Sequence, residues 1–291
     1  MNGTNISDGN AGRIRLALCV ILAVLWFACV IAAAVPDGQT GTIAAALQAL
    51  LLLVFVAIHG SLSNGWRGFF AYAGITLVVS MLLEATSIAH GFPFGFYVHN
   101  MPGPKPFGVP PAVPLGYVVL GWPAWTLARL ITRPHPSLAA NRFITPLVAA
   151  FIITGYDFTY DPIGATVLHM WTYRSPSGYF GVPLSNFLGW LFTSWVFFQI
   201  FALVEQRFPA RNSATQGRLL WVLPCFIWAG TALQYPVKFA YAPAGISSAG
   251  SRTFVTADIY EASVVSALLT MVFIALVAAA HVREGKSTGT S

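Results

Sequence analysis

Runs of about twenty apolar residues, repeated along the chain, constrain its fold more than any other feature. Each run is close to the length that crosses the hydrocarbon core of a bilayer as a helix. They cover residues 16–35, 42–59, 69–89, 114–131, 144–168, 183–204, 219–234 and 259–281. Only 8% of the 291 residues are charged, whereas a soluble domain has roughly 25%. The sequence therefore predicts an all-α, polytopic transmembrane helix bundle of about eight spans, or seven if the short run 219–234 does not cross.

Basic residues are divided unequally between the two sides that eight spans would define. Both termini then lie on one side, together with eleven of the 15 Lys and Arg residues. The other side holds Lys105, Arg174, Lys238 and Arg252. Short basic loops stay in the cytoplasm, so we expect both termini to be cytoplasmic, in the cytoplasmic membrane of a bacterium. The basic residues form no face with stacking aromatics, so we expect no nucleic-acid partner.

The chain reads as one transmembrane domain over 1–291, with short polar tails at 1–12 and 282–291. Two of the loops on the outer side, 90–117 and 169–190, are dense in Gly, Pro and aromatic residues. Rings and fixed backbone angles order such loops. We therefore expect them to cover the outer ends of the helices as a lid or pocket wall.

Carboxylates stand out inside the apolar runs. Asp157 and Asp161 are one helical turn apart and would share a face. Glu84 lies on the order of 10 Å below the outer end of its span, and Asp157 reaches a similar depth. Pro162 is expected to kink or break the helix at Asp161. An ionisable residue within a span costs a few kcal/mol and marks a functional site, although each acid has the alternative of a purely structural hydrogen-bond partner.

Other polar residues are expected near the same level. Asn186, Gln234 and Glu261 fall close to the outer ends of three further spans. His90, His99 and His169 are expected at the membrane surface as interfacial anchors. Polar groups from several helices thus converge on one side of the membrane.

The residue types limit the chemistry. The six histidines form no closely spaced pairs, and there is no dinucleotide fingerprint or phosphate loop, so we expect neither a metal nor a cofactor. What remains is a carboxylic acid in an aromatic, poorly hydrated pocket, which can act as a general acid. Such an acid can protonate an electron-rich alkene, and aromatic faces can stabilise the resulting tertiary carbocation until water adds. The predicted reaction is hydration.

Four sequence motifs carry a family resemblance. They are "E-x6-GFPFGFY" from Glu84 to Tyr97, "GVPPAVPL" at 108–115, "YDP" at 160–162 with Trp171 nine residues on, and "YFGVPLSNFLGW" at 179–190. Over roughly residues 80–190 the chain resembles the membrane carotenoid 1,2-hydratases, of the γ-carotene and bisanhydrobacterioruberin hydratase type. One departure is Gly116-Tyr117, where the family pattern has a Trp soon after "VPL".

The resemblance implies a cofactor-independent carotenoid biosynthesis enzyme, a hydratase and thus a carbon–oxygen lyase. It would add water across the terminal 1,2 double bond of an acyclic carotenoid or related isoprenoid, with membrane lipid as its surroundings. In this hypothesis Asp157 or Asp161 is the general acid, Glu84 is its partner or the base that orients water, and Asn186 holds water or a carboxylate. The substrate-binding rings would be Tyr97, Tyr160, Trp171, Tyr179, Phe180 and Trp190.

Two other functions compete with hydration. Buried acids also serve proton relays, so the chain could be a transporter or carrier of lipids or isoprenoids. The pair of aspartates also resembles half of the diphosphate and Mg²⁺ apparatus of an intramembrane prenyltransferase. A second Asp-rich motif, which such enzymes need, is missing from the sequence.

Overall fold

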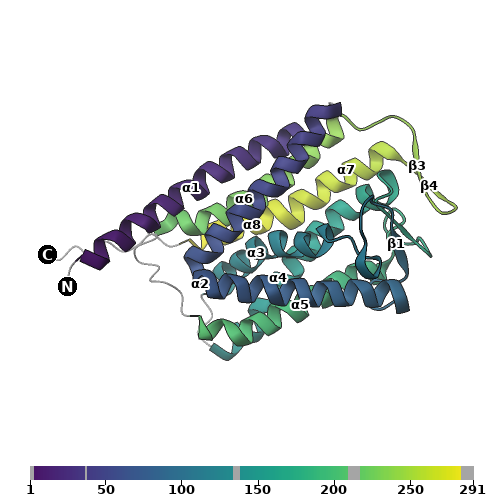
Figure 1. The fold of residues 1–291 in the computed structure, drawn as a ribbon. Helices are drawn as coiled ribbons and strands as arrows, with labels where there is room; N and C mark the ends of the chain where they lie inside the picture. The colour runs from purple at the N-terminus through teal and green to yellow at the C-terminus, as the bar shows by residue number, and fades with distance from the viewer. Residues whose placement is uncertain (1–2, 37, 134–137, 209–216, 283–291) are drawn as a thin grey trace.

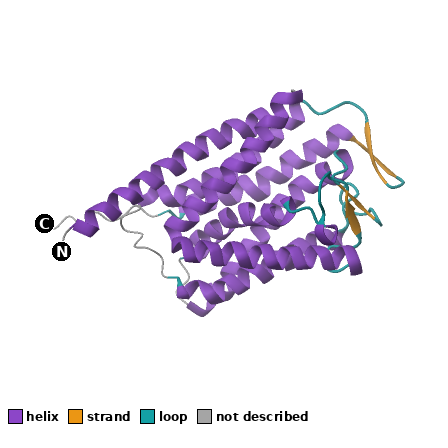
Figure 2. Cartoon of the chain, viewed as in Figure 1, coloured by secondary structure: helices purple, strands orange, loops and turns teal. Residues whose placement is uncertain are grey.

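The computed structural model describes residues 3–36, 38–133, 138–208 and 217–282, which form an elongated bundle of helices (Figures 1 and 2). The α-helices are α1 (Gly3–Ala34), α2 (Gly38–His90), α3 (Ala112–Thr132), α4 (Leu138–Asp161), α5 (Leu184–Val204), α6 (Gly217–Ala240), α7 (Thr256–Ser266) and α8 (Phe273–Ala280). Short helical turns are η1 (Pro106–Gly108), η2 (Pro162–Val167), η3 (Glu205–Arg207) and η5 (Ala267–Val272). Four short strands are β1 (Tyr97–His99), β2 (Trp171–Tyr173), β3 (Ile246–Ala249) and β4 (Arg252–Val255).

Six helical segments are long and apolar enough to cross a membrane. They are Asn10–Ala34, Gly38–His90, Asn141–Val167, Leu184–Arg207, Gly217–Ala240 and Thr256–Ala280. The all-α membrane fold predicted from the apolar runs is therefore confirmed. The count of eight crossings stays a prediction, because it requires α2 to be divided into two spans and α3, which is not among the six, to be added.

Helix α2 turns back on itself at Gly65. A straight helix of its 53 residues would run about 80 Å, well beyond the ~30 Å of a bilayer core. Gly65 has φ 70° and ψ 166°, which only glycine adopts without strain, and the chain reverses there (Figure 1). The two arms, 38–64 and 66–90, correspond to the second and third apolar runs of the sequence.

The seventh apolar run is longer in the structure than its hydropathy suggested. Helix α6 continues through Pro236 to Ala240. Its last turn is closed by Lys238, whose Nζ donates to Gln234 Oε1 at 2.7 Å. The sequence expectation of a short run ending near Gln234 is corrected, because a polar pair one turn apart extends the helix beyond its apolar part.

The two loops expected to form a lid pair with each other at one end of the bundle. Strands β1 and β2 are antiparallel, with Tyr97 opposite Tyr173 and His99 opposite Trp171. Strands β3 and β4 form a second hairpin at the same end (Figure 1). Two segments that are distant in the sequence, 97–99 and 171–173, thus close over the helices together.

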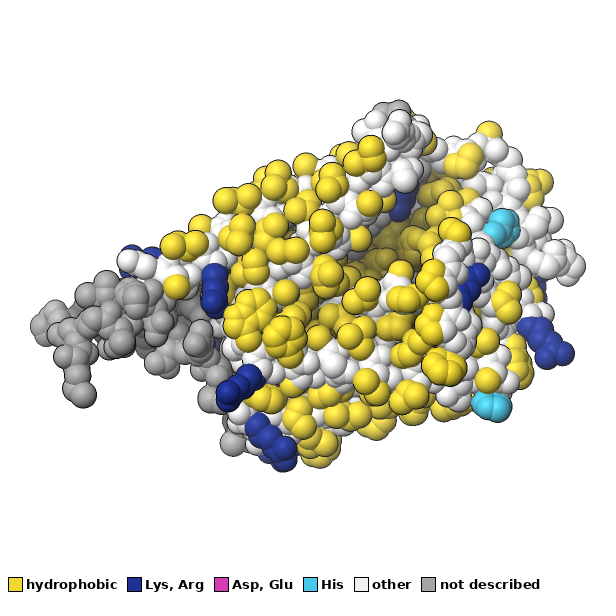
Figure 3. Space-filling model, viewed as in Figure 1, with side chains coloured by type: hydrophobic (Ala, Val, Ile, Leu, Met, Phe, Trp, Pro, Cys, Tyr) yellow, Lys and Arg dark blue, Asp and Glu magenta, His cyan; other side chains and the backbone are white. Residues whose placement is uncertain are grey.

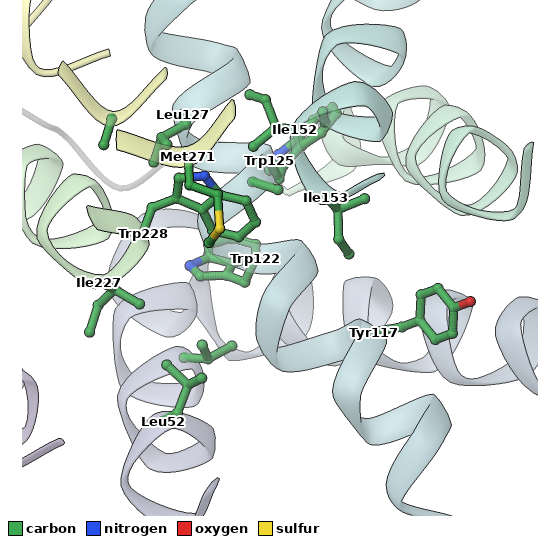
Figure 4. Close-up of a cluster of buried hydrophobic side chains, with 14 of the residues drawn as sticks. Leu52, Tyr117, Trp122, Trp125, Leu127, Ile152, Ile153, Ile227, Trp228 and Met271 are labelled. Carbon is green, nitrogen blue, oxygen red and sulfur yellow. The ribbon is translucent and has the colours of Figure 1, made fainter. Parts of the chain in front are cut away.

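Tryptophan side chains fill the middle of the bundle. Trp122, Trp125 and Trp228 are almost fully buried and meet Met271 from the last membrane segment (Figure 4). Tyr117 stands apart from this cluster, one to two turns along α3 (Figure 4). Helix α3 therefore contributes tryptophans to the apolar core and, nearer its start, the polar side chain of Tyr117.

The outer surface of the helices is apolar, as a lipid-facing surface must be. Large exposed side chains such as Leu25, Phe70, Leu82, Phe151 and Leu269 lie on four different segments, α1, the second arm of α2, α4 and η5. Figure 3 shows this apolar surface on one face, hollowed between the first arm of α2 and the end that carries β1.

Basic side chains are visible at both ends of the bundle (Figure 3), and those of Arg15, Arg129, Arg133 and Arg142 lie at the end opposite the strands. The guanidinium of Arg15 lies 5.8 Å from the Trp66 ring, next to the reversal of α2. Arg129, near the end of α3, is paired at 3.0 Å with Glu205, just after α5. The bundle therefore has one basic end and one end closed by loops.

Candidate active site

Helix α4 carries two buried carboxyl groups on one face. Asp157 is 1% exposed and Asp161 is 3% exposed, one helical turn apart. Of the kink or break that the sequence predicted at Asp161, the break does not occur, since Asp161 has helical angles of φ −57° and ψ −40°. Instead, Pro162 begins a π-helical turn, closed by the Leu168 N–H donating to the Ile163 carbonyl. Widening the helix by one residue per turn accommodates the missing proline N–H and keeps both aspartates on one continuous helix.

Asn186, two residues into α5, joins the two aspartates. Its Nδ2 donates to Asp157 Oδ2 at 3.0 Å and to Asp161 Oδ2 at 2.7 Å. The two carboxyl oxygens therefore lie within two hydrogen-bond lengths of each other. Tyr173 of β2 adds a third bond, because its hydroxyl donates to Asp161 Oδ2 at 2.5 Å.

Glu84 forms a second polar group in the second arm of α2. It is 4% exposed and accepts hydrogen bonds from the hydroxyls of Tyr97, in β1, and Tyr117, in α3, the latter at 3.0 Å. The Nε2 atom of His99 lies 3.7 Å from Glu84 Oε2, too far for a direct hydrogen bond. Both ring nitrogens of His99 are buried without a hydrogen-bond partner among the described residues.

A cavity of about 140 Å³ lies between these two polar groups. Its volume is several times the roughly 30 Å³ that one water occupies in the liquid. Most of the wall is apolar or aromatic, and its carboxyl groups belong to the two polar groups. The lining residues are Glu84, Phe94, Tyr97, His99, Ala112, Val113, Gly116, Leu120, Tyr156, Asp157, Tyr160, Asp161, Trp171, Tyr173, Asn186 and Trp190.

Aromatic rings are held in place around the cavity by other rings. Trp190 stacks on Tyr117 with the ring centroids 4.2 Å apart. Tyr160 lies 6.2 Å from Trp171, and its ring also has the Lys238 ammonium 5.8 Å from its centroid. Such fixed faces can stabilise a positive charge that develops in the cavity.

Two glycines allow the lid to approach the helices closely. A Cβ on Gly164 would lie 2.5 Å from the Trp171 ring, and a Cβ on Gly189 would lie 2.5 Å from Phe94. Ser87 of α2 ties the same loop down, because its hydroxyl donates to the Gly95 carbonyl at 2.7 Å. The strands that supply the tyrosines are thus packed directly onto α2, η2 and α5.

The tyrosines of the strands stay protonated donors. Burial, followed by the charge of Glu84, raises the pKa of the Tyr97 hydroxyl well above its ordinary value. Burial, followed by the charge of Asp161, does the same to the pKa of Tyr173. Each phenol therefore stays protonated at neutral pH, and its O–H donates a hydrogen bond to a carboxylate oxygen.

Eight of the ten site residues predicted from the sequence meet in this cavity. They are Asp157, Asp161, Glu84, Asn186, Tyr97, Tyr160, Trp171 and Trp190. Tyr179 and Phe180 do not line it. Tyr179 stacks on Phe158 at 4.4 Å, and Phe180 packs against Phe254 of β4.

Several other polar residues lie elsewhere than the sequence suggested. Glu261 is exposed and lines a separate surface groove with Asp258, and Gln234 is buried but bonds to Lys238. His90 and His169 are exposed, as expected for surface positions. His99 is corrected from a surface anchor to a cavity residue, because the β1–β2 pairing turns it inward toward Glu84.

Sequence reasoning did not place three polar residues in the site: Tyr117 and Tyr173, which donate hydrogen bonds to its carboxylates, and His99, which lies near Glu84. Tyr117 had a signal, since it occupies a position where the family pattern differs. Tyr173 and His99 had none, because their positions depend on pairing between two distant loops. Within the described ranges, no group of three His, Cys, Asp or Glu side chains is placed to hold a metal ion.

The fold and the cavity together define an integral membrane protein with buried carboxylates in an aromatic pocket. The sequence model of the carotenoid biosynthesis protein family matches residues 40–251, so the chain belongs to that family. It is also similar to the bisanhydrobacterioruberin hydratase of Haloarcula japonica, with 26% identity over 187 residues. These residues are 61% of this chain and 62% of that relative, so the match spans less than two thirds of its length. No solved structure matches the chain. The family resemblance drawn from the four motifs is confirmed.

Proposed function

We propose that this protein adds water across the terminal 1,2 double bond of an acyclic carotenoid or a closely related isoprenoid. The observation that carries the proposal is the division of three buried carboxyl groups into two hydrogen-bonded sets across one small cavity. Asp157 and Asp161 share an amide on one side, and Glu84 holds two phenols on the other. A hydration needs an acid and a base in this arrangement. The hydratase activity in the name of the Haloarcula japonica relative supports the same reaction class.

The hydrogen bonds distinguish the two aspartates. Asp161 accepts bonds from both Asn186 and Tyr173 and is suited to remain a carboxylate. Asp157 accepts a hydrogen bond from Asn186 and from no other side chain among the described residues. Two carboxylates this close disfavour double ionisation, so the pair holds one proton, as other carboxyl dyads do. In the proposal Asp157 carries this proton and is the general acid.

Protonation forms the first new bond. The Asp157 proton is transferred to the CH carbon of the terminal alkene, the π bond breaks, and a tertiary carbocation forms at the dimethyl carbon. Trp171 and Trp190 line the cavity, and Trp190 is held by its stack on Tyr117. Cation–π attraction of about 0.5–2 kcal/mol per ring would stabilise the cation.

Water addition completes the reaction at the opposite wall. The 3.7 Å gap between His99 Nε2 and Glu84 Oε2 suits a bridging water, which would satisfy the unpartnered ring nitrogen. The water oxygen bonds to the cation and passes one proton to Glu84. The product is a tertiary alcohol heavier by one water, and return of the proton from Glu84 to Asp157 restores the site.

The size of the cavity limits which part of the substrate can enter it. About 140 Å³ holds a branched end group with a water, and a whole carotenoid is much larger. The rest of the chain would lie along the apolar helix surface, which is hollowed on the face in Figure 3. We further propose that the basic end faces the cytoplasm, in a bacterial cytoplasmic membrane, so that the end group enters from the outer half.

The first test is the substitution Asp157→Asn, which keeps the shape of the side chain and removes the acid. It should abolish formation of the alcohol in cells that accumulate lycopene, while the protein inserts in normal amount. Asp258→Asn, at an exposed position in the first turn of α7, is the matched control and should keep full activity. Turnover by Asp157→Asn would remove Asp157 from the mechanism.

A further inference from the structure

A second cavity lies at the basic end of the bundle, opposite the candidate active site. Its volume is about 300 Å³, and it opens where α3 and α5 end and where α4 and α6 begin. Three arginines line it: Arg129, Arg133 and Arg142. The proposed hydration does not involve this cavity, so the reaction does not explain why three arginines line it.

The arginines outnumber the acids of the cavity. Arg129 donates to Glu205 Oε1 at 3.0 Å, and the same oxygen accepts a bond from Asn64 Nδ2 at 2.8 Å. Glu205 is the one acidic residue among the lining residues that the structure describes. Arg133 and Arg142 are exposed and have no ion-pair partner within the described part of the chain. Two guanidinium groups are therefore available to an anion.

A buried indole N–H in the cavity wall also lacks an acceptor. Trp125 is 2% exposed and lines the cavity, yet its Nε1 has no hydrogen-bond partner among the described residues. Its ring is fixed against Phe198, with the centroids 5.6 Å apart. Buried N–H groups are rarely left unpaired in native proteins. An oxygen of a bound anion would satisfy this donor.

We propose that this cavity binds the phosphate group of an anionic phospholipid. Arg133 and Arg142 match phosphate oxygens through paired N–H donors, and the Trp125 N–H supplies a further donor. The cavity lies at the ends of the membrane helices, which is the level of the lipid head groups. Basic pockets between membrane helices are known sites for such head groups. The same phosphate chemistry could come from free phosphate, so the test separates the two sources.

The test is a lipid titration of the purified full chain in a neutral detergent, read by native mass spectrometry and by thermal unfolding. Phosphatidylglycerol should bind and raise the melting temperature, and phosphatidylcholine should bind at least tenfold more weakly. The double substitution R133Q/R142Q should weaken phosphatidylglycerol binding by at least tenfold. The matched control R174Q/R252Q removes two exposed arginines at the strand end and should leave binding unchanged.

One further variant and two control measurements complete the test. Trp125→Phe keeps the ring stack and removes the N–H, so it should weaken binding by about threefold to tenfold. Unfolding of each variant without lipid checks that it folds. Equal loss of binding in R174Q/R252Q, or full binding by R133Q/R142Q, would overturn the site. Inorganic phosphate binding as tightly as phosphatidylglycerol would overturn the assignment to a lipid.

Discussion

The amide of Asn186 offers the sharpest test of how the aspartate pair is arranged. Asn186→Ala removes the one side chain that donates to both Asp157 and Asp161. Asp161 would keep its bond from Tyr173, whereas Asp157 would lose the hydrogen bond from Asn186, its one donor among the described residues. The substitution therefore disturbs the proposed general acid more than its partner.

The structure sets the expected size of this effect. One hydrogen bond to a charged or charge-sharing carboxyl group contributes about 1.5–3 kcal/mol. If that bond positions the acid in the transition state, its loss slows the reaction by about 10- to 150-fold. The lower end applies if water replaces the amide, because a water can donate to the same oxygens.

The assay measures the initial rate of alcohol formation from an acyclic carotenoid in membranes with equal amounts of inserted protein. Asn64→Ala is the matched control, because Asn64 is as buried as Asn186 and also donates to a carboxylate, at the opposite end of the bundle. Asn64→Ala should lower thermal stability and leave the rate within about threefold. A rate for Asn186→Ala within threefold of the unmodified protein would refute the role of the amide.

Three further predictions follow from the same geometry. Tyr173→Phe removes the 2.5 Å hydrogen bond to Asp161 and should slow turnover about tenfold, with an unchanged amount of inserted protein. An unchanged rate would exclude Tyr173 from the site. Gly189→Ala places a methyl group 2.5 Å from the Phe94 ring and should destabilise the protein by about 1–3 kcal/mol, measured by thermal unfolding. Gly74→Ala, with open space around the new Cβ, should cause no loss of stability, and equal losses would argue against close packing of the lid. Finally, treatment with a chelator should leave the hydration rate unchanged. Activity on a prenyl diphosphate that the chelator abolishes and Mg²⁺ restores would favour a prenyltransferase.

The helical part of the site could be predicted because it depends on local spacing and depth. A separation of four positions places Asp157 and Asp161 on one helix face, whatever the rest of the chain does. The depth of Glu84 followed from its distance to the end of an apolar run. Asn186 was predicted from its place just inside the next run. These residues meet in the cavity as expected.

The lid could not be predicted at the level of single side chains. His99 and Tyr173 turn inward because β1 and β2 pair in one register, and a shift by one residue would turn both outward. Tyr179 and Phe180 lie in an aromatic motif, yet the loop turns away at Gly181, which has φ 90° and packs beside Ala249. These outcomes depend on contacts between loops far apart in sequence, which local patterns do not specify.

At Asp161, where the sequence predicted a kink or a break before Pro162, the helix changes to π-helical hydrogen bonding without breaking. A proline disfavours the helix at the residue before it, and Asp161 nevertheless keeps helical angles. The π-helical turn from Pro162 to Val167 absorbs the conflict. It also changes the direction in which the following residues leave the helix, which brings Trp171 over Gly164. A π-helical turn next to two buried acids is typical of functional sites.

The central claim is tested most directly by the origin of the product oxygen. The chain would be expressed in cells that accumulate lycopene or another acyclic carotenoid, grown in water labelled with heavy oxygen, and the pigments analysed by mass spectrometry. The account predicts a tertiary alcohol heavier by one labelled water, formed by the unmodified chain and absent with Asp157→Asn. A correctly inserted protein that forms no labelled alcohol from any of several acyclic carotenoids would contradict it.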